Sequence, residues 1–387
     1  MLKMNIKKTF KFVILFFGFL FYTMSQCYAN DEDTIVIVSK NKDSYWNSLF
    51  NGHIDRTFEK RFDMSFVSAP SYTREASFGI GGMATALYRV DRTDSVMVPS
   101  NITMTFNASI NGFYALTAEG NHNFKGRRSR LSYQIAFFNK NLNFWGITYD
   151  DCNVNLISSY RRQQYKVSLN YQYELFKNFY TGALLDFSLV HASKIDEISY
   201  LLGQKRTYTA TGLGLSLQYD SRDFIPNPKQ GMYILLRETV YPEMLGNTGR
   251  TLWRTTLITD FYQKVWEGGI IAFDLYGQIS SNNLPWTMRE ELGGNRMRGY
   301  YTGQYIDNNI VSGQIELRQH VVKRLGASAW IGGGSVFPSL QEFDVKKILP
   351  NYGVGLRFEI KHNVNGRVDF GLGKQTGGFV FGMNEVF

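Results

Sequence analysis

Apolar and polar residues alternate one by one along much of this chain. Between Gln164 and Leu175 the apolar positions are Tyr165, Val167, Leu169, Tyr171 and Tyr173, each followed by a polar residue. Because successive side chains of a β-strand point to opposite faces, the pattern predicts a strand with one apolar and one hydrophilic face. The alternation returns over 271–280 and 352–360, again with charges on the hydrophilic face. Such charges suit a watery lumen better than the dry core of a β-sandwich.

Sixteen segments of this kind follow one another. They lie at approximately 63–72, 75–89, 98–109, 111–121, 129–139, 157–174, 178–192, 206–220, 231–241, 252–265, 268–281, 306–320, 323–336, 351–361, 365–374 and 377–387. An even number returns both ends of a bacterial barrel to the periplasmic side. We therefore predict an all-β fold, a 16-stranded antiparallel transmembrane β-barrel, with 140–156, 282–305 and 337–350 as extracellular loops.

The first 29 residues predict a secretory signal peptide. Four lysines precede a short apolar run over 12–22, and Cys27-Tyr28-Ala29 is a small-x-small cleavage site. The alternative is a lipoprotein signal acylated at Cys27, but Gln26 stands where such signals want a small residue. Residues 30–61 form a short N-terminal periplasmic segment, either a disordered lead-in or one amphipathic helix, ahead of a barrel at 62–387.

Charge, cysteine count and aromatic content limit the class of protein to which this chain can belong. Removing the signal takes away four lysines and no acid, so the formal charge falls from +9 to about +5, which does not suggest a nucleic-acid partner. Cys152 is then the only cysteine, which excludes an intramolecular disulfide. Aromatic residues make up 16% of a chain whose mean hydropathy is negative. That pairing fits a membrane β-barrel with aromatic girdles better than the alternative, a secreted β-sandwich.

Three sequence features together suggest a family. The first is a strand-turn motif with Tyr219, Asp220, Arg222 and Asp223, followed by Pro226, Pro228 and Gly231. The second is the glycine-rich segment 293–300, which ends in Arg298-Gly299-Tyr300, and the third is a last segment that closes on Phe387. With these features the chain resembles the BamA-like superfamily of outer-membrane assembly and translocation barrels, also called bacterial surface-antigen barrels, over about 62–387.

The resemblance implies that the loop between strands 11 and 12 folds back into the lumen. It also implies that Phe387 acts as a terminal-strand signal. Assembly members of the family usually carry periplasmic POTRA domains, for which 30–61 is too short, so a reduced form without them is expected.

An inward-pointing arginine needs carboxylate or aromatic partners. By alternation Glu316 faces inward on the strand after the loop, and the resemblance implies that the loop arginine contacts an acid there. It implies a second contact to an aromatic-x-Asp element, which reads Trp330-Ile331-Gly332 here. We expect an Arg298–Glu316 pair with Trp330 packed nearby, although Gly332 replaces the aspartate. The pair either switches the loop or only braces it, and Asp220, Arg222 and Asp223 read most simply as turn-capping charges.

The seam between the first and last strands is expected to be weak. Pro70 cannot donate a ladder hydrogen bond, and Gly377, Gly378 and Gly382 weaken strand packing. The resemblance makes this seam a lateral gate, where an incoming strand pairs with an exposed edge. The leading hypothesis is an assembly or insertion factor for outer-membrane proteins in a Gram-negative bacterium. Its partners would be membrane lipids, other outer-membrane or periplasmic assembly proteins, or barrel substrates. The alternatives are a pore or protein-translocating channel and a structural subunit of an envelope complex.

Enzymatic chemistry is not indicated. The five histidines lie on separate segments without metal-ligand spacing or a nucleophile-base pairing, so we expect no catalytic residues, no metal and no cofactor. Glycine-rich stretches at 79–82 and 332–334 lack the Lys-Ser/Thr and the helix of a phosphate loop.

Overall fold

The computed structural model describes residues 57–58, 61–73, 77–94, 97–126, 128–225, 227–361, 364–385 and 387. The expected signal peptide at 1–29 lies outside these residues, as do nearly all of the segment 30–61 and the turn residue Pro226.

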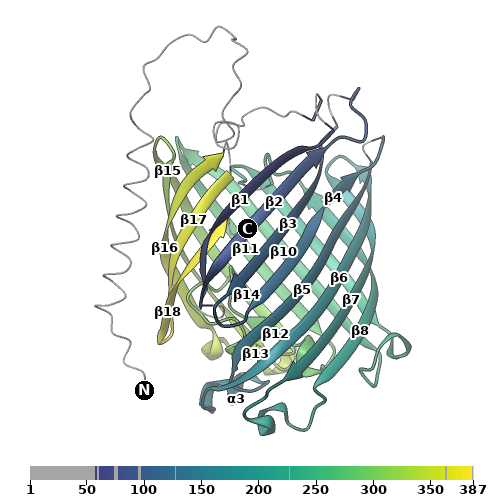
Figure 1. The fold of residues 1–387 in the computed structure, drawn as a ribbon, viewed down its shortest axis with the longest axis vertical. Helices are drawn as coiled ribbons and strands as arrows, with labels where there is room; N and C mark the ends of the chain where they lie inside the picture. The colour runs from purple at the N-terminus through teal and green to yellow at the C-terminus, as the bar shows by residue number, and fades with distance from the viewer. Residues whose placement is uncertain are drawn as a thin grey trace. The chain divides into compact units, whose positions relative to one another are not determined.

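Sixteen antiparallel strands form one sheet. In order they are β1 (Asp63–Thr73), β2 (Ser77–Tyr88), β3 (Ser100–Ser109), β4 (Tyr114–Asn123), β5 (Ser129–Phe144), β6 (Ser158–Phe176), β7 (Phe179–Ser193), β8 (Thr207–Asp220), β9 (Gly231–Tyr241), β10 (Leu252–Trp266), β11 (Gly269–Ser280), β14 (Asn309–Val322), β15 (Leu325–Phe337), β16 (Leu349–Lys361), β17 (Val364–Gly373) and β18 (Thr376–Met383). Each strand pairs with the next, so the sheet runs from β1 to β18. Figure 1 shows that it curls round until these two end strands lie beside each other. The predicted 16-stranded β-barrel is confirmed.

The remaining elements are short and belong to the connections. They are α3 (Tyr149–Val154), the 3-10 turns η1 (Ile198–Leu201), η2 (Glu243–Leu245), η3 (Trp286–Met288), η4 (Leu340–Glu342) and η5 (Val345–Lys347), and the two-stranded hairpin β12 (Glu290–Leu292) and β13 (Tyr305–Asp307). In the part of the chain that the structure describes, no helix has the length and apolar character needed to cross a membrane.

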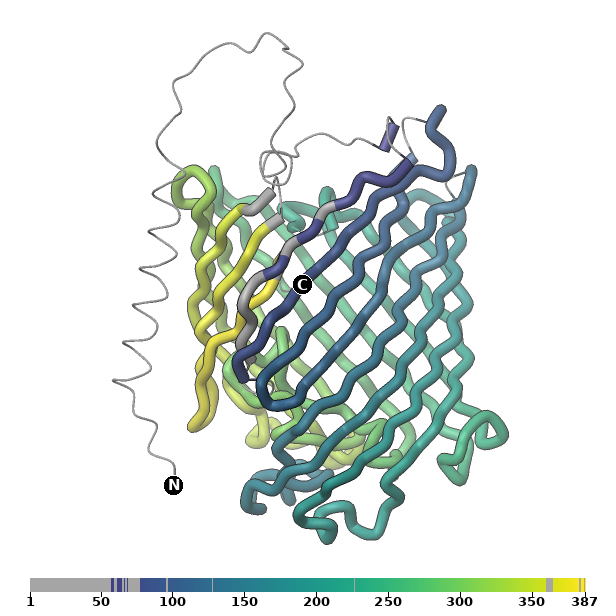
Figure 2. The backbone as a smooth tube through the Cα atoms, viewed as in Figure 1, coloured from purple at the N-terminus to yellow at the C-terminus, as the bar shows by residue number. Residues whose placement is uncertain are grey.

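The alternation seen in the sequence separates the two faces of the wall. In β6, Tyr165 and Tyr171 are about half exposed on the outside, whereas Asn170 and Gln172 are buried on the inside. The backbone trace in Figure 2 shows the strands strongly tilted, as closure of a barrel requires.

A compact cap closes the barrel end that carries α3, β12 and β13 (Figure 1). Its core packs aromatic and aliphatic side chains from the connections after β5 and β11, among them Trp145, Tyr149, Tyr301 and Tyr305, against the ends of β14, β15 and β16. Tyr149 and Tyr305 stack with ring centroids 5.3 Å apart. The connections at this end therefore hold one another, and they orient the long loop between β11 and β14.

Several strand ends differ from the predicted boundaries, and two of these differences affect the site. The segment predicted at 306–320 begins only at Asn309, because residues 305–307 pair with β12 inside the loop. The last strand, predicted at 377–387, ends at Met383, and Asn384 adopts a left-handed φ of 60°. Phe379 contacts the outward Phe370, so a continued strand would point Glu385 outward as well, toward lipid, where a carboxylate is costly. The chain instead turns inward and buries Glu385 among arginines.

Candidate functional site

The site is the long loop between β11 and β14, whose tip enters the barrel. The hairpin of β12 and β13 forms its stem, with Glu290 opposite Asp307. Glu290 accepts a hydrogen bond from the Tyr276 hydroxyl on β11 (3.2 Å), and Glu291 pairs with Arg162 on β6. Burial raises the pKa of the Asp307 carboxyl, which also accepts the Tyr149 N–H at 3.2 Å. The stem is thus tied to the wall and to the cap.

Gly299 lets the loop tip lie directly on the wall. Its φ is +97°, and a Cβ placed on it would lie 2.5 Å from the backbone of Gly371 on β17. The reverse also holds, since a Cβ on Gly371 would lie 2.4 Å from the Arg298 carbonyl. Two glycines therefore meet backbone to backbone, and no other residue type fits at either position without displacement.

Arg298 is completely buried at this contact. One terminal nitrogen lies 2.6 Å from Glu316 on β14, and the other lies 3.1 Å from Asp369 on β17. Gln314 accepts a further hydrogen bond at 3.0 Å. The guanidinium carbon stands 3.4 Å from the centre of the Trp330 ring on β15, a close cation–π stack. The structure thus contains the expected Arg298–Glu316 contact and the Trp330 packing; their role in function stays a prediction.

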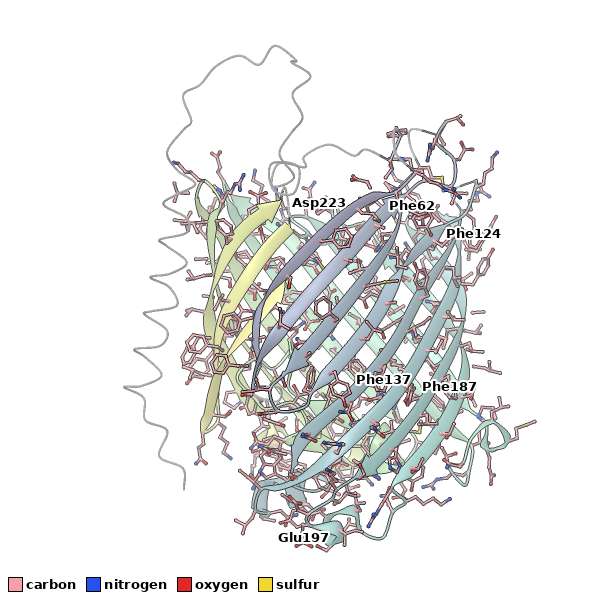
Figure 3. All side chains as sticks on the ribbon, in the orientation of Figure 1. Phe62, Phe124, Phe137, Phe187, Glu197 and Asp223 are labelled. Carbon is pink, nitrogen blue, oxygen red and sulfur yellow. The ribbon has the colours of Figure 1, made fainter. Side chains whose placement is uncertain are left out.

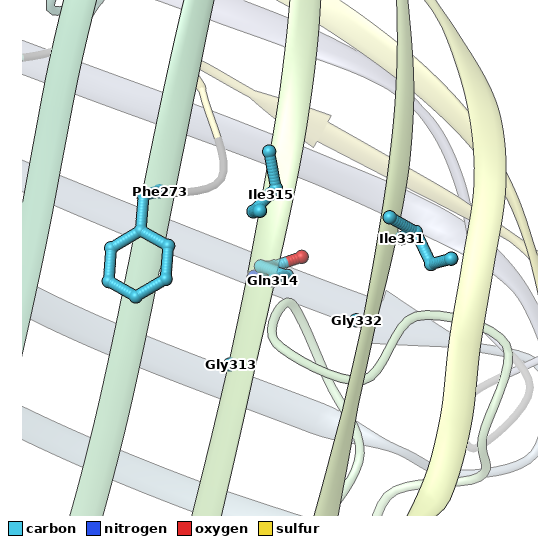
Figure 4. Close-up of a pocket in the computed structure, with 6 residues that line it drawn as sticks. All are labelled: Phe273, Gly313, Gln314, Ile315, Ile331 and Gly332. Atoms are coloured by element: carbon cyan, nitrogen blue, oxygen red, sulfur yellow. The ribbon is translucent and has the colours of Figure 1, made fainter.

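The aspartate that is missing at position 332 has a counterpart elsewhere. Gly332 pairs with Gln314 across the β14–β15 ladder, and a Cβ there would lie 2.3 Å from the Gly313 carbonyl oxygen. Figure 4 shows Gly332 beside Gln314 at a depression in the wall, bordered by Phe273, Ile315 and Ile331. No side chain fits at 332, and Asp369, two strands further on, supplies the second carboxylate for Arg298.

Tyr300 fixes the tip against the last strands. Its hydroxyl donates to the Pro350 carbonyl at 2.7 Å and accepts the Lys374 N–H at 2.7 Å. The ring occupies the space over Gly373, where a Cβ would lie 2.2 Å from a ring carbon. Burial raises the pKa of Tyr300 to about 12. Beside it, Thr376 on β18 donates to the Gly299 carbonyl at 2.8 Å. All three residues of the motif therefore touch β16, β17 or β18.

Arg298 and the two acids that bind it, Glu316 and Asp369, form what we call the loop anchor. Three more arginines surround this anchor, and the sequence analysis did not predict their contacts with it. Arg318 lies 2.8 Å from Glu316, while Arg357 and Arg367 lie 2.6 Å and 2.7 Å from Asp369. The available signal was the alternation over 365–374, which turns Arg367 and Asp369 to the same inward face. What alternation alone does not give is the register that puts Arg357 opposite Arg367.

The strand-turn motif lies at the other end of the barrel. In Figure 3, Asp223 labels the end opposite Glu197, which marks the end that carries the cap. Arg222 forms a two-pronged ion pair with Asp220, both contacts at 2.9 Å, and stacks over the Tyr233 ring. Asp223 accepts the N–H groups of residues 224, 229 and 230, and Tyr219, the last residue but one of β8, pairs with Phe179. These contacts are those of a capped turn, separate from Arg298.

The residues singled out at the seam lie on its two strands. Pro70 is in β1 opposite Ile80. On β18, Gly377 pairs with Leu372 and Gly378 with Gly371. Gly382 faces Arg367, and a Cβ there would lie 2.8 Å from the guanidinium.

Phe387 is not part of the last strand. Its ring lies 6.2 Å from the buried Tyr262 ring on β10, and its carbonyl accepts from Arg318 at 3.3 Å. Within the described residues, no three His, Cys, Asp or Glu side chains gather in a way that could hold a metal ion.

Comparison with known proteins agrees with this geometry. The barrel is similar to the structure of BamA from Haemophilus ducreyi lacking POTRA domains 1-3, with 12% identity and a TM-score of 0.56 over 84% of this chain and 70% of that one. CdiB from Escherichia coli gives 15% identity and a TM-score of 0.59 over 82% of this chain. CdiB from Acinetobacter baumannii gives 11% and 0.55 over 84%. The chain spans 60% of the length of each CdiB structure.

Among curated protein sequences none matches the chain. The profile of the Omp85 superfamily domain, in contrast, matches residues 101–387, well over half of the sequence. The resemblance drawn from the motifs is thereby confirmed: the chain belongs to the Omp85 superfamily.

Proposed function

We propose that this protein lies in the outer membrane of a Gram-negative bacterium and helps other outer-membrane proteins to insert there, together with partner subunits. Family membership supports a role in assembly or transport. The outward belt of exposed apolar side chains on the strands, such as Ile135, Leu215 and Val354, suits contact with lipid. We infer that the protein is not an enzyme.

The seam is the observation that carries the proposal. In the described residues the ladder of hydrogen-bonded strands has β1 and β18 as its two ends, although the strands lie next to each other. β18 has 8 residues, whereas β6 has 19. A short, incompletely paired edge presents free N–H and C=O groups, to which an incoming strand can add by β-augmentation. An insertion factor would use such an edge to hold its substrate.

The position of the loop tip inside the barrel favours this route over a steadily open pore. The loop tip and its buried arginine occupy the inside of the wall between β14 and β18. A channel that conducts all the time would need this tip displaced. The alternatives, a pore or translocating channel and a structural subunit, are separated from the proposal by planar-bilayer conductance and by the proteins that copurify with the barrel.

A disulfide across the seam tests the proposal directly. Cysteines placed on β1 near Phe66 and on β18 near Val380, in a Cys152→Ser background, would lock the two ends together. The matched control is a pair at Phe66 and Ala84, which are direct register partners on β1 and β2, so that it cross-links the wall without closing the seam. Only the seam pair should lower the amounts of outer-membrane proteins, with recovery on reduction. Unchanged amounts in cells that carry the oxidised seam pair would refute the gate.

Depletion of the protein with quantitative outer-membrane proteomics then separates the functions. A broad loss of barrels supports assembly. Loss of one exported protein points to dedicated translocation, and no loss points to a pore or scaffold.

A further inference from the structure

The residues that follow β18 enter the lumen and occupy a built site there. Asn384 turns the chain with its positive φ and donates its N–H to the Asn365 carbonyl at 2.7 Å. The Glu385 side chain is then only 2% exposed. We call Asn384, Glu385 and Phe387 the inward segment.

Four strands supply the partners of the inward segment. Glu385 lies 2.9 Å from Arg357 on β16 and 3.5 Å from Arg318 on β14, and it accepts from Asn365 on β17 at 2.8 Å. The Phe387 ring stacks on Tyr262 of β10, with the Arg318 guanidinium 5.1 Å from its centre. An acid and an aromatic ring thus meet two guanidinium groups, an amide and a second ring.

Two arginines of this site also hold the loop anchor. Arg318 contacts Glu385 and, at 2.8 Å, Glu316. Arg357 contacts Glu385 and, at 2.6 Å, Asp369. Glu316 and Asp369 are the two acids that bind Arg298. Each arginine therefore lies between an acid of the inward segment and an acid of the loop anchor.

The charge count of the cluster gives the sign of the coupling. Four arginine side chains (298, 318, 357 and 367) face three acidic side chains (316, 369 and 385), so these side chains have a net charge of +1. Without the Glu385 charge it is +2. Arg318 and Arg357 would then compete with Arg298 for Glu316 and Asp369, and two acids in place of three would offset the repulsion among the four guanidinium groups.

We propose that the inward segment is an internal ligand of the lumen, and that its docking and the docking of the Arg298 loop tip stabilise each other. Release of either one loosens the other by the same factor, because coupling between two sites is reciprocal. The seam strand β18 and the extracellular loop are thereby linked through side chains, although they lie far apart in the sequence. The coupling is independent of the proposed function and would hold in a barrel with any activity.

Hydrogen exchange measured by mass spectrometry on the purified, lipid-reconstituted barrel tests the coupling. In Glu385→Gln, exchange over the loop tip 293–303 should rise about tenfold, within the usual range for coupled sites. The matched control is Glu119→Gln, which neutralises a lumenal acid of β4 that binds Gln134 at 3.0 Å, outside the cluster. Loop-tip exchange in the control should stay within about twofold of the wild type.

The reciprocal experiment uses Arg298→Ala and follows exchange over 379–387, which should rise by a similar factor. If Glu385→Gln does not fold, Phe387→Ala replaces it in the experiment, because this variant removes the ring contacts and keeps every charge. It should release the inward segment and increase hydrogen exchange at the loop tip. A variant that frees the inward segment while the loop tip keeps its wild-type exchange would overturn the proposal. Faster tip exchange in the Glu119 control, equal to that in Glu385→Gln, would do so as well.

Discussion

Replacing Arg298 with alanine should lower the thermal stability of the folded barrel by several degrees. The substitution removes one of the cations that contact Glu316 and Asp369, both fully buried, and it removes the stack on Trp330. Breaking a buried ion pair from one side costs about 3–5 kcal/mol. Arg318, Arg357 and Arg367 still contact these acids and partly compensate their charge, so we expect the loss at the lower end of that range.

The structure sets the scale of the temperature shift. The sheet spans 321 residues from Asp63 to Met383. At roughly 2.1 cal/mol/K per residue, the unfolding entropy is about 0.7 kcal/mol/K. A loss of about 3–5 kcal/mol then corresponds to a midpoint lower by about 4–8 °C.

The assay is the loss of the fast-migrating folded form on gels after heating in detergent. Lys347→Ala is the control, since it also removes the cation of an ion pair, but the side chains of Lys347 and its partner Asp150 are 34% and 78% exposed. It should shift the midpoint by less than half as much. Equal midpoints for Arg298→Ala and the wild type would show that the anchor adds no stability, and the motif would then mark ancestry alone.

Four further predictions concern the same loop and the cap. Gly371→Ala should undock the tip and lower the midpoint about as much as Arg298→Ala, because the new methyl would lie 2.4 Å from the Arg298 backbone; Gly277→Ala, with nothing within 4 Å, should change little. In planar bilayers the wild type should give small, flickering currents and Gly371→Ala larger, sustained ones, and equal currents would contradict the lumenal position of the tip. Burial raises the pKa of the Cys152 thiol to about 12, so iodoacetamide at pH 8 should label it only after unfolding. The pKa of this thiol is higher in the folded than in the unfolded protein, so its contribution to stability is complete below about pH 9 and is lost as the pH rises toward 12. Cys152→Ala should therefore reduce the loss of stability at alkaline pH. A pH profile of stability equal to that of the wild type would contradict this prediction.

The strands were predictable because the barrel wall imposes a period of two on almost every segment. The segment predicted at 157–174 is observed at Ser158–Phe176, for example. The error was larger where a strand leaves the membrane. The segment predicted at 129–139 continues to Phe144, because its last residues pack into the cap, where Phe144 contacts Trp286. Polar–apolar alternation fails there since both faces meet protein.

The anchor was predictable only in part. Glu316 follows from alternation on the strand next to the loop, which is a local property. Asp369 does not, because its contact with Arg298 depends on the register of three successive strand pairs and on how deeply the tip descends. The inward turn at Asn384 was missed for a related reason. A segment that ends in Glu-Val-Phe reads as a strand until the outward direction of Glu385 is known.

The sequence predicts one consequence of the glycines in the last strands, and the structure reveals a second. The sequence predicts that Gly377, Gly378 and Gly382 weaken the seam, and β18, which carries them, has 8 residues. Yet Gly371 and Gly373 on β17 make room for Arg298 and Tyr300, and Gly382 on β18 makes room for Arg367. Larger side chains at these positions would pack the seam-side strands more firmly and would exclude the loop tip and the charge cluster. Glycines of β17 and β18 therefore make the space in which the loop tip and the charge cluster dock, and we expect changes at the loop and at the seam to act together.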